Sequence, residues 1–467
     1  MDFMNTIFYN NKFVEIYPWD GQSDESLEIR DYLNGNIIAC FPDINSISKV
    51  AGGARNLQRK WNILSRKDKI EMLEQTGERL VDRSEYDKFI ASGGGFPIKY
   101  VEEARKEIGN YLKNSEIFLQ KNPGRGPVVA ATSVTAPIIQ PFIMTETLYG
   151  NCSFTIKGDS REPFSAYMLA DISFEIGLPI QFITYRTSGK KAFAGDLYNM
   201  CRMDGGHFIL MGDPSTPKNI AYGKILNQID LNALPLPQNM IAFTAHGGSM
   251  IVDESSDILK AVGGAIDSFK YPRACKVPTG IFVFESILDE FIDELCKIVR
   301  NQTVGDVLNR NADIAKLSET HWNIVDDFIR IAKTNGEIVH GGKINQPTII
   351  KGHFYSSLSM EPQFPVYCIE AVDDETQAIG KINDVASNTP QRKILDLSVY
   401  SENESLLQKI HNLRKEGLLK VHSLHFNRPT LSYNPYTAHE GIILREFLSE
   451  PHFLDSEGIV SYDFIFK

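Results

Sequence analysis

The sequence predicts an α/β protein built on parallel, doubly wound sheets, and two observations carry this prediction. Strand-like apolar runs alternate with amphipathic, helix-like segments over most of the chain, and several of the runs close on glycine. The chain has 467 residues, of which 42% are hydrophobic and 23% are charged, ordinary values for a soluble globular protein. This length is sufficient for two or three domains with a large core.

The first half of the chain begins with short strands and turns over residues 1–50 and then becomes helical. Apolar residues at three- and four-residue spacing predict two helical stretches within residues 56–117, separated by the glycines of residues 92–96. An amphipathic helix is predicted over residues 165–177, where Gly177 ends it. Buried strands are predicted at residues 126–134, 180–187, 207–212 and 240–248.

A second alternating block follows Asp253. Helices are predicted from residue 257 onward, at 287–299 and at 406–417. Strands are predicted at residues 281–284, 347–350, 366–372 and 395–400. The two blocks predict a domain boundary near residue 246. In parallel sheets ligands bind beyond the carboxyl ends of the strands, so the glycines that close the runs at Gly212 and at Gly247-Gly248 are candidate cofactor positions.

Composition excludes several classes of function. The net charge of −11, from 48 basic and 59 acidic residues, argues against a nucleic-acid or anionic-membrane partner. The six cysteines are scattered without a CxxC pair, so neither a disulfide framework nor a metal site is expected. The N-terminus has no signal-peptide pattern, and no apolar run reaches the ~18 residues of a membrane span. A cytoplasmic enzyme is expected.

The cysteine at position 275 lies in FKYPRACKVPTGIFVFESILDEF, residues 269–291, in a short loop before a predicted strand. Its neighbours Arg273 and Lys276 are cationic, which favours the thiolate form. A free cysteine is more often a buried residue that packs as a small hydrophobe. Cys296, at an apolar position of the following helix, fits that description. Cys275 precedes its strand instead, and this position predicts a reactive thiol.

The same stretch resembles the nucleophile loop of the aldehyde dehydrogenase superfamily, where a cysteine precedes an aromatic-valine pair, a Glu-Ser pair and an acidic helix. Cys275, Phe282-Val283 and Glu285-Ser286 follow that plan without a gap. YGNCSFTIKGDSREPFSAYMLADISFEIGLP, residues 149–179, is similar to the superfamily segment that runs from a Gly-Asn pair through a lysine to Gly-Leu-Pro. The likeness covers roughly residues 50–430.

The resemblance implies an aldehyde dehydrogenase-like fold, with a Rossmann-type cofactor domain and a second α/β catalytic domain. It assigns residues 1–245, with about 430–450, to the dinucleotide-binding domain. Residues 246–429 form the catalytic domain that carries the nucleophilic cysteine. Residues 451–467 are then a C-terminal tail that serves oligomerisation, and a homo-oligomer, either a dimer or a tetramer, is expected.

Two departures from the superfamily pattern favour its acylating branch. Hydrolytic members carry a glutamate base just before the Gly-Gly pair, where this chain has Ala245, and an asparagine in the oxyanion site, where it has Thr135. The nearest resemblance is to the LuxC-type acyl-CoA reductase family, through RAC before the strand, KGDSREPFSAYMLA, MGDP at 211–214 and the early GGGF. That branch implies reduction of an acyl thioester, on CoA or an acyl carrier, to an aldehyde, with an acyl-transferring or synthetase partner.

The resemblance also assigns residues that bind the cofactor. Lys157 would reach the adenosine ribose hydroxyls, and Ser160 with Arg161 replaces the glutamate of NAD-preferring members. Loss of a carboxylate and gain of a guanidinium suit a 2′-phosphate, so NADP is expected, with NAD as the alternative. The other expected cofactor residues are Gly212, Gly247, Gly248, Glu361 and Phe364.

The implied reaction begins with attack of the Cys275 thiolate on the thioester. The backbone N–H of Cys275 and the Thr135 hydroxyl would hold the oxyanion, and His246, His422 or His425 would move a proton. One rival is an ordinary NAD(P)-dependent aldehyde dehydrogenase that uses another base, such as His246. A second rival is a catalytically silent family member that serves as a scaffold or ligand-binding subunit.

Overall fold

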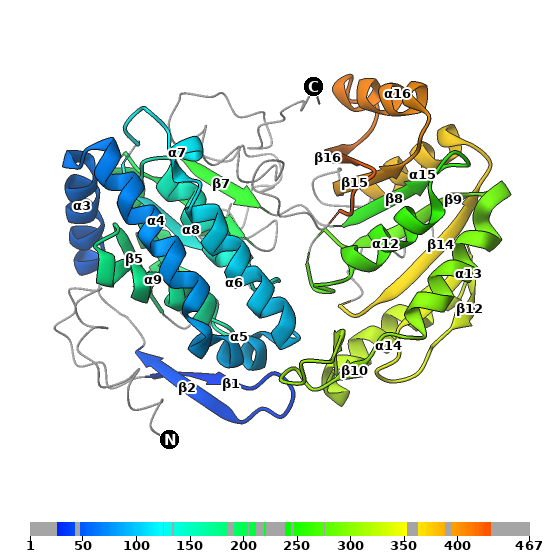
Figure 1. Cartoon of the computed structure of the whole chain (residues 1–467), viewed down its shortest axis with the longest axis horizontal. Helices are drawn as coiled ribbons and strands as arrows, with labels where there is room; N and C mark the ends of the chain where they lie inside the picture. Colours follow the sequence, from blue (N-terminus) through cyan, green and yellow to red (C-terminus); the bar gives the residue numbers. More distant parts are fainter. Residues whose placement is uncertain are drawn as a thin grey trace. The chain divides into compact units, whose positions relative to one another are not determined.

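The computed structural model describes residues 26–42, 47–124, 126–132, 135–184, 191–203, 205–211, 219–220, 239–243, 247–274, 276–352, 363–387 and 394–430. The chain divides between residues 244 and 245 into two compact units (Figure 1). Described residues up to Phe243 belong to the first unit, and those from Gly247 to Thr430 belong to the second. Among the described residues, no helix is both long and apolar enough to cross a membrane.

The first unit contains a five-stranded sheet in the order β5-β4-β3-β6-β7, and every neighbouring pair is parallel. Its strands are β3 (Val128–Ala131), β4 (Phe154–Lys157), β5 (Ile180–Ile183), β6 (His207–Met211) and β7 (Met240–Phe243). The parallel pairing confirms the predicted sheet. An antiparallel ribbon of β1 (Ser26–Arg30) and β2 (Ile37–Pro42) precedes it.

Helices cover the sheet of the first unit. They are α3 (Ile47–Ile63), α4 (Arg66–Asp82), η1 (Ser84–Tyr86), α5 (Asp87–Gly94), α6 (Ile98–Leu112), α7 (Ser115–Phe118), α8 (Ile139–Tyr149), α9 (Phe164–Ile176) and α10 (Lys191–Met203). The connections through α8 and α9 run from β3 to β5 across the sheet, whereas α10 returns to β6 on the other side of β3. Right-handed crossovers therefore place α10 on the face opposite α8 and α9, the doubly wound arrangement.

Helix α8 has no periodic signature in the sequence, and all of its residues are buried. Its sequence IQPFIMTETLY is apolar around most of its circumference, because α8 packs against both β4 and the helices α6 and α9. A helix that is buried on every side has no polar stripe to alternate with an apolar one. This is why the helix could not be predicted from its spacing.

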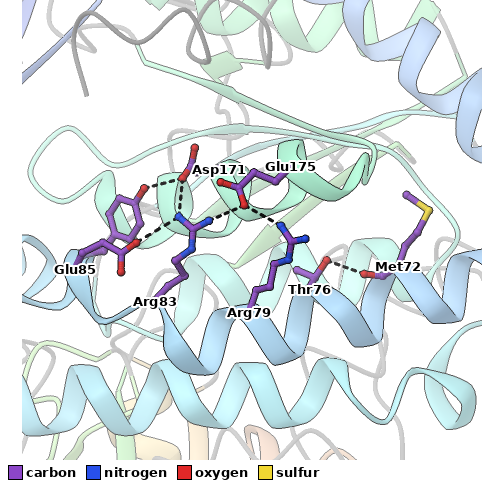
Figure 2. Close-up of polar contacts among 8 residues, drawn as sticks. Met72, Thr76, Arg79, Arg83, Glu85, Asp171 and Glu175 are labelled. Atoms are coloured by element: carbon purple, nitrogen blue, oxygen red, sulfur yellow. Dashed lines mark hydrogen bonds and ion pairs between the residues drawn. The ribbon is translucent and has the colours of Figure 1, made fainter. Parts of the chain in front are cut away.

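Two arginines join α4 to α9 through an ion-pair network, drawn in Figure 2. Arg83, which caps the carboxyl end of α4, donates to Glu175 Oε2 at 2.6 Å and lies 3.4 Å from Asp171 Oδ2. Arg79 Nη1 donates to the same Glu175 oxygen at 2.9 Å, and the Tyr86 hydroxyl donates to Asp171 at 2.8 Å. Asp171 is buried, so these donors offset the cost of removing its carboxylate from water.

Replacing Arg83 by methionine is expected to lower the free energy of unfolding of the first unit by about 1–2 kcal/mol, because Asp171 and Glu175 both lose a charged donor. Arg83→Met should therefore shift the urea unfolding midpoint measured by circular dichroism. The matched control is Arg79→Met, whose side chain is 49% exposed and has one partner in this network. An equal shift in both variants would contradict the special role of Arg83.

The second unit contains a seven-stranded sheet in the order β12-β13-β14-β9-β8-β15-β16, in which β12 alone pairs antiparallel. Its strands are β8 (Gly248–Val252), β9 (Pro278–Phe284), β12 (Gly336–His340), β13 (Thr348–Gly352), β14 (Val366–Val372), β15 (Ile394–Tyr400) and β16 (Val421–Phe426). Two-residue strands β10 (Val304–Gly305) and β11 (Ile314–Ala315) pair separately. The α/β class predicted from the sequence is thus confirmed in both units.

The helices of the second unit follow its strands in alternation. They are α12 (Ile258–Ser268), η4 (Glu285–Ile287), α13 (Leu288–Val299), α14 (Glu319–Lys333), α15 (Glu375–Ser387) and α16 (Glu404–Lys415). One core cluster gathers β8, β9, β14 and β15 under α15 and α16 through residues such as Ile251, Phe282 and Leu397. Buried residues of α15 and α16, among them Ile382 and Ile410, belong to this same cluster, so the apolar faces of both helices pack on the sheet.

The predicted strand at residues 240–248 is wrong in its extent. Strand β7 ends at Phe243, and Gly248 opens β8 in the other unit, so Gly247 and Gly248 begin a strand instead of ending one. Gly247 has φ +80°, a left-handed conformation that favours glycine. A Cβ on Gly248 would meet the Lys276 carbonyl oxygen at 2.3 Å, so only glycine fits there. The left-handed backbone conformation selects Gly247, and close backbone approach selects Gly248.

Candidate functional site

The first unit brings the expected cofactor residues to the carboxyl edge of its sheet. Lys157 is the last residue of β4 and pairs with Ala131, the last residue of β3. Thr135 follows β3 in the connection to α8 and is half-buried. Lys157 is almost fully buried, and this burial lowers the pKa of its amine. The loops after β3 and β4 are therefore neighbours at the edge where parallel sheets bind ligands.

Three side chains that can donate hydrogen bonds share the loop that follows β4. Lys157 ends the strand, Ser160 is half-buried, and the Arg161 side chain is 60% exposed. The Asp159 carboxylate accepts from the Arg161 backbone N–H at 2.7 Å and lies 3.4 Å from Arg161 Nε. Arg161 thus offsets the charge of Asp159, and a lysine, a serine and an arginine in one loop suit an anionic ligand.

A buried glutamine holds this loop to the end of β3. Gln140 of α8 accepts from the Thr132 hydroxyl at 3.0 Å and from the Asp159 N–H at 3.2 Å. Its Nε2 donates to the Glu162 carbonyl at 2.9 Å and to the Ser165 hydroxyl at 2.8 Å. Sequence analysis did not find Gln140 or Glu162. Gln140, a polar residue among apolar neighbours, was the only signal in the sequence, because Glu162 follows Asp159, Ser160 and Arg161 and is not marked out by its neighbours.

Glu162 is fully buried, and burial raises the pKa of its carboxyl to about 8, although hydrogen bonds from Ser165 oppose this effect. The native state therefore keeps a proton that the unfolded chain releases near its ordinary value of 4.5. The contribution of Glu162 to the free energy of unfolding is fully present below the pKa of the unfolded chain. It falls as the pH rises from about 4.5 to about 8 and does not change further above that pH. The loop after β4, which is expected to bind the ribose, is thus less stable in alkaline solution.

Replacing Glu162 by glutamine is expected to remove this loss. Above pH 8 the variant should unfold at a higher urea concentration than the wild type, and its free energy of unfolding should be larger by on the order of a few kcal/mol. The free energies of the two proteins should converge near pH 4.5. The measurement is the urea midpoint from pH 4.5 to 9. Glu71→Gln, an exposed change on α4, is the control. A constant difference between Glu162→Gln and wild type across this range would contradict the assignment.

The second unit brings the nucleophile loop to the amino edge of its sheet. Cys275 lies outside the described residues, but the residues on both sides of it are described, and Ala274 and Lys276 are buried. The Gly248 N–H donates to the Val277 carbonyl at 2.9 Å, and Leu395 N–H donates to the Gly247 carbonyl at 2.9 Å. Backbone hydrogen bonds thus join the cysteine loop, the glycine turn and the start of β15.

Three ionisable side chains are buried at this edge. Lys276 Nζ lies 3.9 Å from Asp396 Oδ2, and His425 Nε2 lies 2.5 Å from Asp396 Oδ1. All three side chains are at most 8% exposed. His422, another histidine expected to move protons, is also buried on β16. The structure therefore places His425 with Lys276, which was expected only to favour the thiolate form of Cys275, and with Asp396, which was not expected at the site.

The remaining expected residues divide into two sets. Phe364 precedes β14 and is fully buried, with its ring 5.4 Å from that of Trp322 on α14, so the structure gives it a packing contact. Cys296 is buried on α13, which confirms its predicted place in the core.

Among the described residues, no cluster of His, Cys, Asp and Glu suits a metal ion. Of the residues that the sequence assigned to the site or to its departures from the superfamily, Gly212, Ala245, His246, Cys275 and Glu361 lie outside the described part of the chain.

Solved structures share this fold. A crystal structure described as an E. coli NADP dependent enzyme matches with a TM-score of 0.74 and 17% identity over 89% of both chains. NADP-dependent glyceraldehyde-3-phosphate dehydrogenase from Bacillus halodurans C-125, complexed with NADP, matches with a TM-score of 0.73 and 17% identity, covering 87% of this chain and 88% of that one. At such identities the likeness shows the fold alone.

Curated proteins share its sequence at a distance. 1-Pyrroline-5-carboxylate dehydrogenase of Oceanobacillus iheyensis is 25% identical over 351 residues, 72% of this chain and 65% of the relative, slightly less than two thirds of its length. Succinate-semialdehyde dehydrogenase (NADP+) of Escherichia coli K12 is 21% identical over 403 residues, 78% of this chain and 81% of the relative.

The family match agrees with the fold and with the residues that surround the expected nucleophile. A model of the aldehyde dehydrogenase family matches residues 96–421, which is more than half of the chain, and the chain therefore belongs to the aldehyde dehydrogenase family.

Proposed function

We propose that this chain interconverts an aldehyde and an acyl group carried on Cys275, with NAD(P) as the hydride carrier. Family membership and the retained cysteine support this chemistry. The names of the relatives, among them succinate-semialdehyde and 1-pyrroline-5-carboxylate dehydrogenases, favour oxidation of a free aldehyde to an acid over the reduction of a thioester. The two reactions share the acyl-enzyme and differ in what releases it.

One observation favours thioester reduction, and it carries our choice between the two. The residue two positions before Gly247 is Ala245, so the chain has no carboxylate where hydrolytic members hold the base that activates water. An enzyme that loads an acyl group onto a cysteine and then reduces it must not activate water. We therefore propose that the chain belongs to the acylating branch, like the LuxC-type reductases, and reduces an acyl thioester to an aldehyde.

The proposed reaction balances as follows. The Cys275 thiolate attacks the acyl carbon, a C–S bond to Cys275 forms, the C–S bond to the carrier thiol breaks, and the carrier thiolate takes up a proton. NADPH, when bound, supplies a hydride to the acyl carbon. The C–S bond to Cys275 then breaks, which releases the aldehyde and restores the thiolate. The Cys275 backbone N–H would hold the oxygen that carries negative charge between these steps.

Product analysis tests the choice. The purified chain is incubated with acyl-CoAs of graded chain length and NADPH, and aldehyde, free acid and free thiol are measured together. One aldehyde per thiol released supports thioester reduction. Release of acid from an aldehyde and NAD(P)+ without any added thiol would support the dehydrogenase alternative, with a base such as His246. The same assay on a thioester of an acyl carrier identifies the donor, and size-exclusion chromatography tests the proposed homo-oligomer.

The loop after β4 supports NADP as the preferred cofactor. Lys157, Ser160 and Arg161 can supply donors to a 2′-phosphate, Arg161 offsets the charge of the Asp159 carboxylate, and burial raises the pKa of the Glu162 carboxyl to about 8. These residues fit the adenosine end of the cofactor.

The wild type is expected to use NADPH at least about tenfold better than NADH, as kcat/KM, because the 2′-phosphate gains a charge-assisted donor. Ser160→Glu should reverse this preference by placing a carboxylate beside the phosphate. Ser160→Gln is the matched control, since it has the same size without the charge. A wild-type preference for NADH that Ser160→Glu leaves unchanged would show that this loop does not contact the ribose.

A further inference from the structure

A buried glutamine in the first unit spans part of the loop that is expected to meet the cofactor. Gln140 of α8 is fully buried, and its side-chain amide contacts the loop on both sides of the pair Ser160-Arg161. Its Oε1 accepts from the Asp159 N–H at 3.2 Å, and its Nε2 donates to the Glu162 carbonyl at 2.9 Å. The two residues that Gln140 holds are therefore the ones that flank Ser160 and Arg161.

A side-chain amide is the group that fits both contacts. The Asp159 N–H can only donate and the Glu162 carbonyl can only accept, so the side chain between them must carry one acceptor and one donor. The Thr132 hydroxyl, which follows β3, donates to the same Oε1 at 3.0 Å. Nε2 also donates to Ser165 Oγ of α9 at 2.8 Å and lies 3.3 Å from Glu162 Oε2. Gln140 thus joins the loop both to the end of β3 and to the start of α9.

The loop also packs against the end of α5. A Cβ on Gly93 would lie 2.9 Å from the Arg161 carbonyl oxygen, and a Cβ on Gly94 would lie 3.3 Å from Glu162 Cγ. The glycines that separate the two predicted helical stretches therefore let α5 approach this loop closely. The backbone at Arg161 thus has two supports, the end of α5 and the contacts that Gln140 makes with its neighbours.

We infer that Gln140 is a positioning residue for the cofactor: by holding Asp159 and Glu162, it fixes Ser160 and Arg161 where they meet the adenosine ribose, and it thereby sets the discrimination between NADP and NAD. This inference rests on the proposed function in taking the loop after β4 as the site of the adenosine end. A loop that is already held loses less conformational entropy when its ligand binds. A guanidinium also favours a phosphate over a hydroxyl most strongly when it is held at hydrogen-bonding distance.

Equilibrium binding of the two cofactors tests the inference without catalysis. The Kd values of NADPH and NADH, which differ only by the 2′-phosphate, are measured by nicotinamide fluorescence in wild type, Gln140→Met and the control Gln58→Met. The wild type should bind NADPH about tenfold more tightly than NADH. Gln140→Met should weaken the binding of NADPH about tenfold and of NADH about twofold, so that the ratio of the two Kd values falls to about twofold. A wild-type ratio in Gln140→Met would overturn the inference.

Gln58 of α3 provides a matched control at the other end of the same strand. It is also buried, its Oε1 accepts from the Ser153 N–H at 2.6 Å, and its Nε2 donates to the Asn151 carbonyl at 3.2 Å. These contacts lie just before β4, at the amino edge of the sheet. Gln58→Met should lower the thermal midpoint as Gln140→Met does, because each change leaves backbone groups without a partner, but it should keep both Kd values within about twofold of wild type. An equal loss of discrimination in Gln58→Met would overturn the inference, because general destabilisation would then explain it.

A double-mutant cycle with Arg161 separates a positioning role from a purely structural one. If Gln140 acts through this loop, adding Gln140→Met to Arg161→Ala should change the ratio of the two Kd values by less than about twofold, whereas independent effects would multiply. Multiplied effects would overturn the inference. Should Gln140→Met fail to fold, Thr132→Val decides, because it removes the hydroxyl that holds Gln140 Oε1 and leaves the amide in place. Thr132→Val should lower the ratio about threefold, and an unchanged ratio in that variant would then overturn the inference.

Failure of this inference can be distinguished from failure of the proposed function. If product analysis shows acid instead of aldehyde while Gln140→Met loses discrimination, the proposed thioester reduction fails and this inference stands. If aldehyde is formed but Gln140→Met keeps the wild-type Kd values, the reaction stands and this inference fails. A wild type that binds NADPH and NADH equally would overturn this inference together with the proposed preference for NADP.

Discussion

Replacing Cys275 by serine is expected to abolish the acyl adduct and to lower aldehyde formation by at least about 10³-fold. A serine hydroxyl is not ionised at neutral pH, whereas a thiolate is the reactive form of cysteine, and Lys276 lies directly beside it in the chain. An oxygen ester, even if it formed, would also be a poorer hydride acceptor than a thioester. The measurement is the intact mass after exposure to acyl-CoA, followed by peptide mapping and by single-turnover formation of aldehyde.

Two buried cysteines provide the controls for this experiment. Cys296 packs in the core on α13, and burial raises the pKa of its thiol. The Cys201 thiol is fully buried and donates to the His207 carbonyl at 3.0 Å. Cys296→Ser and Cys201→Ser should keep both adduct and aldehyde formation. Acylation that maps to either of these residues in the wild type would show that the nucleophile was placed wrongly.

The strands and helices with a strong periodic pattern could be predicted closely. Residues 366–372, a run of apolar residues between loops, form β14 over the same bounds. The segment that was expected to be an amphipathic helix ending at Gly177 forms α9, and Gly177 caps it with φ +94°, but every residue from Phe164 to Ser173 is buried, so the expected polar face is wrong. These signals are local, because an apolar strand and a glycine that ends a helix are visible in their own residues.

Elements that depend on their surroundings could not be predicted in the same way. Helix α8 is buried on all sides and has no stripe, and the start of β8 at Gly248 depends on a close approach to the Lys276 carbonyl. The residues next to Gly248 in the sequence give no signal of that contact. The predicted strand at residues 240–248 was wrong for this reason, since residues 240–243 form β7 and Gly248 opens β8 in the other sheet.

The site shows the same division. Lys157 could be placed at the end of a strand because the strand and its last residue are adjacent in the sequence. Asp396 and His425 are 29 positions apart and join only because β15 and β16 pair in parallel. Gln140 and Glu162 are likewise 22 positions apart and meet at the ends of β3 and β4. Buried polar partners of this kind follow from the sheet order, which spacing does not encode.

Replacing Ala245 by glutamate is expected to redirect the acyl-enzyme to water. Ala245 lies three residues before Gly248, whose N–H is bonded to Val277, and Cys275 lies two residues before Val277. A carboxylate at position 245 would therefore start from a backbone position only a few residues from the nucleophile loop. A positioned general base is worth about 10²- to 10⁴-fold, so even an imperfectly placed one should raise the ratio of acid to aldehyde at least about tenfold.

The decisive quantity is this ratio at fixed acyl-CoA and NADPH, compared between wild type, Ala245→Glu and the control Ala245→Gln. Glutamine has nearly the same volume as glutamate but cannot take a proton from water, so a gain of acid in Ala245→Glu alone assigns the effect to base catalysis and not to a looser turn. The gain should also grow as the pH rises through the range in which the introduced carboxyl ionises. Mostly acid from the wild type itself would contradict thioester reduction, because a chain that already hydrolyses its acyl-enzyme must hold a base elsewhere, and the aldehyde dehydrogenase alternative would then describe its reaction.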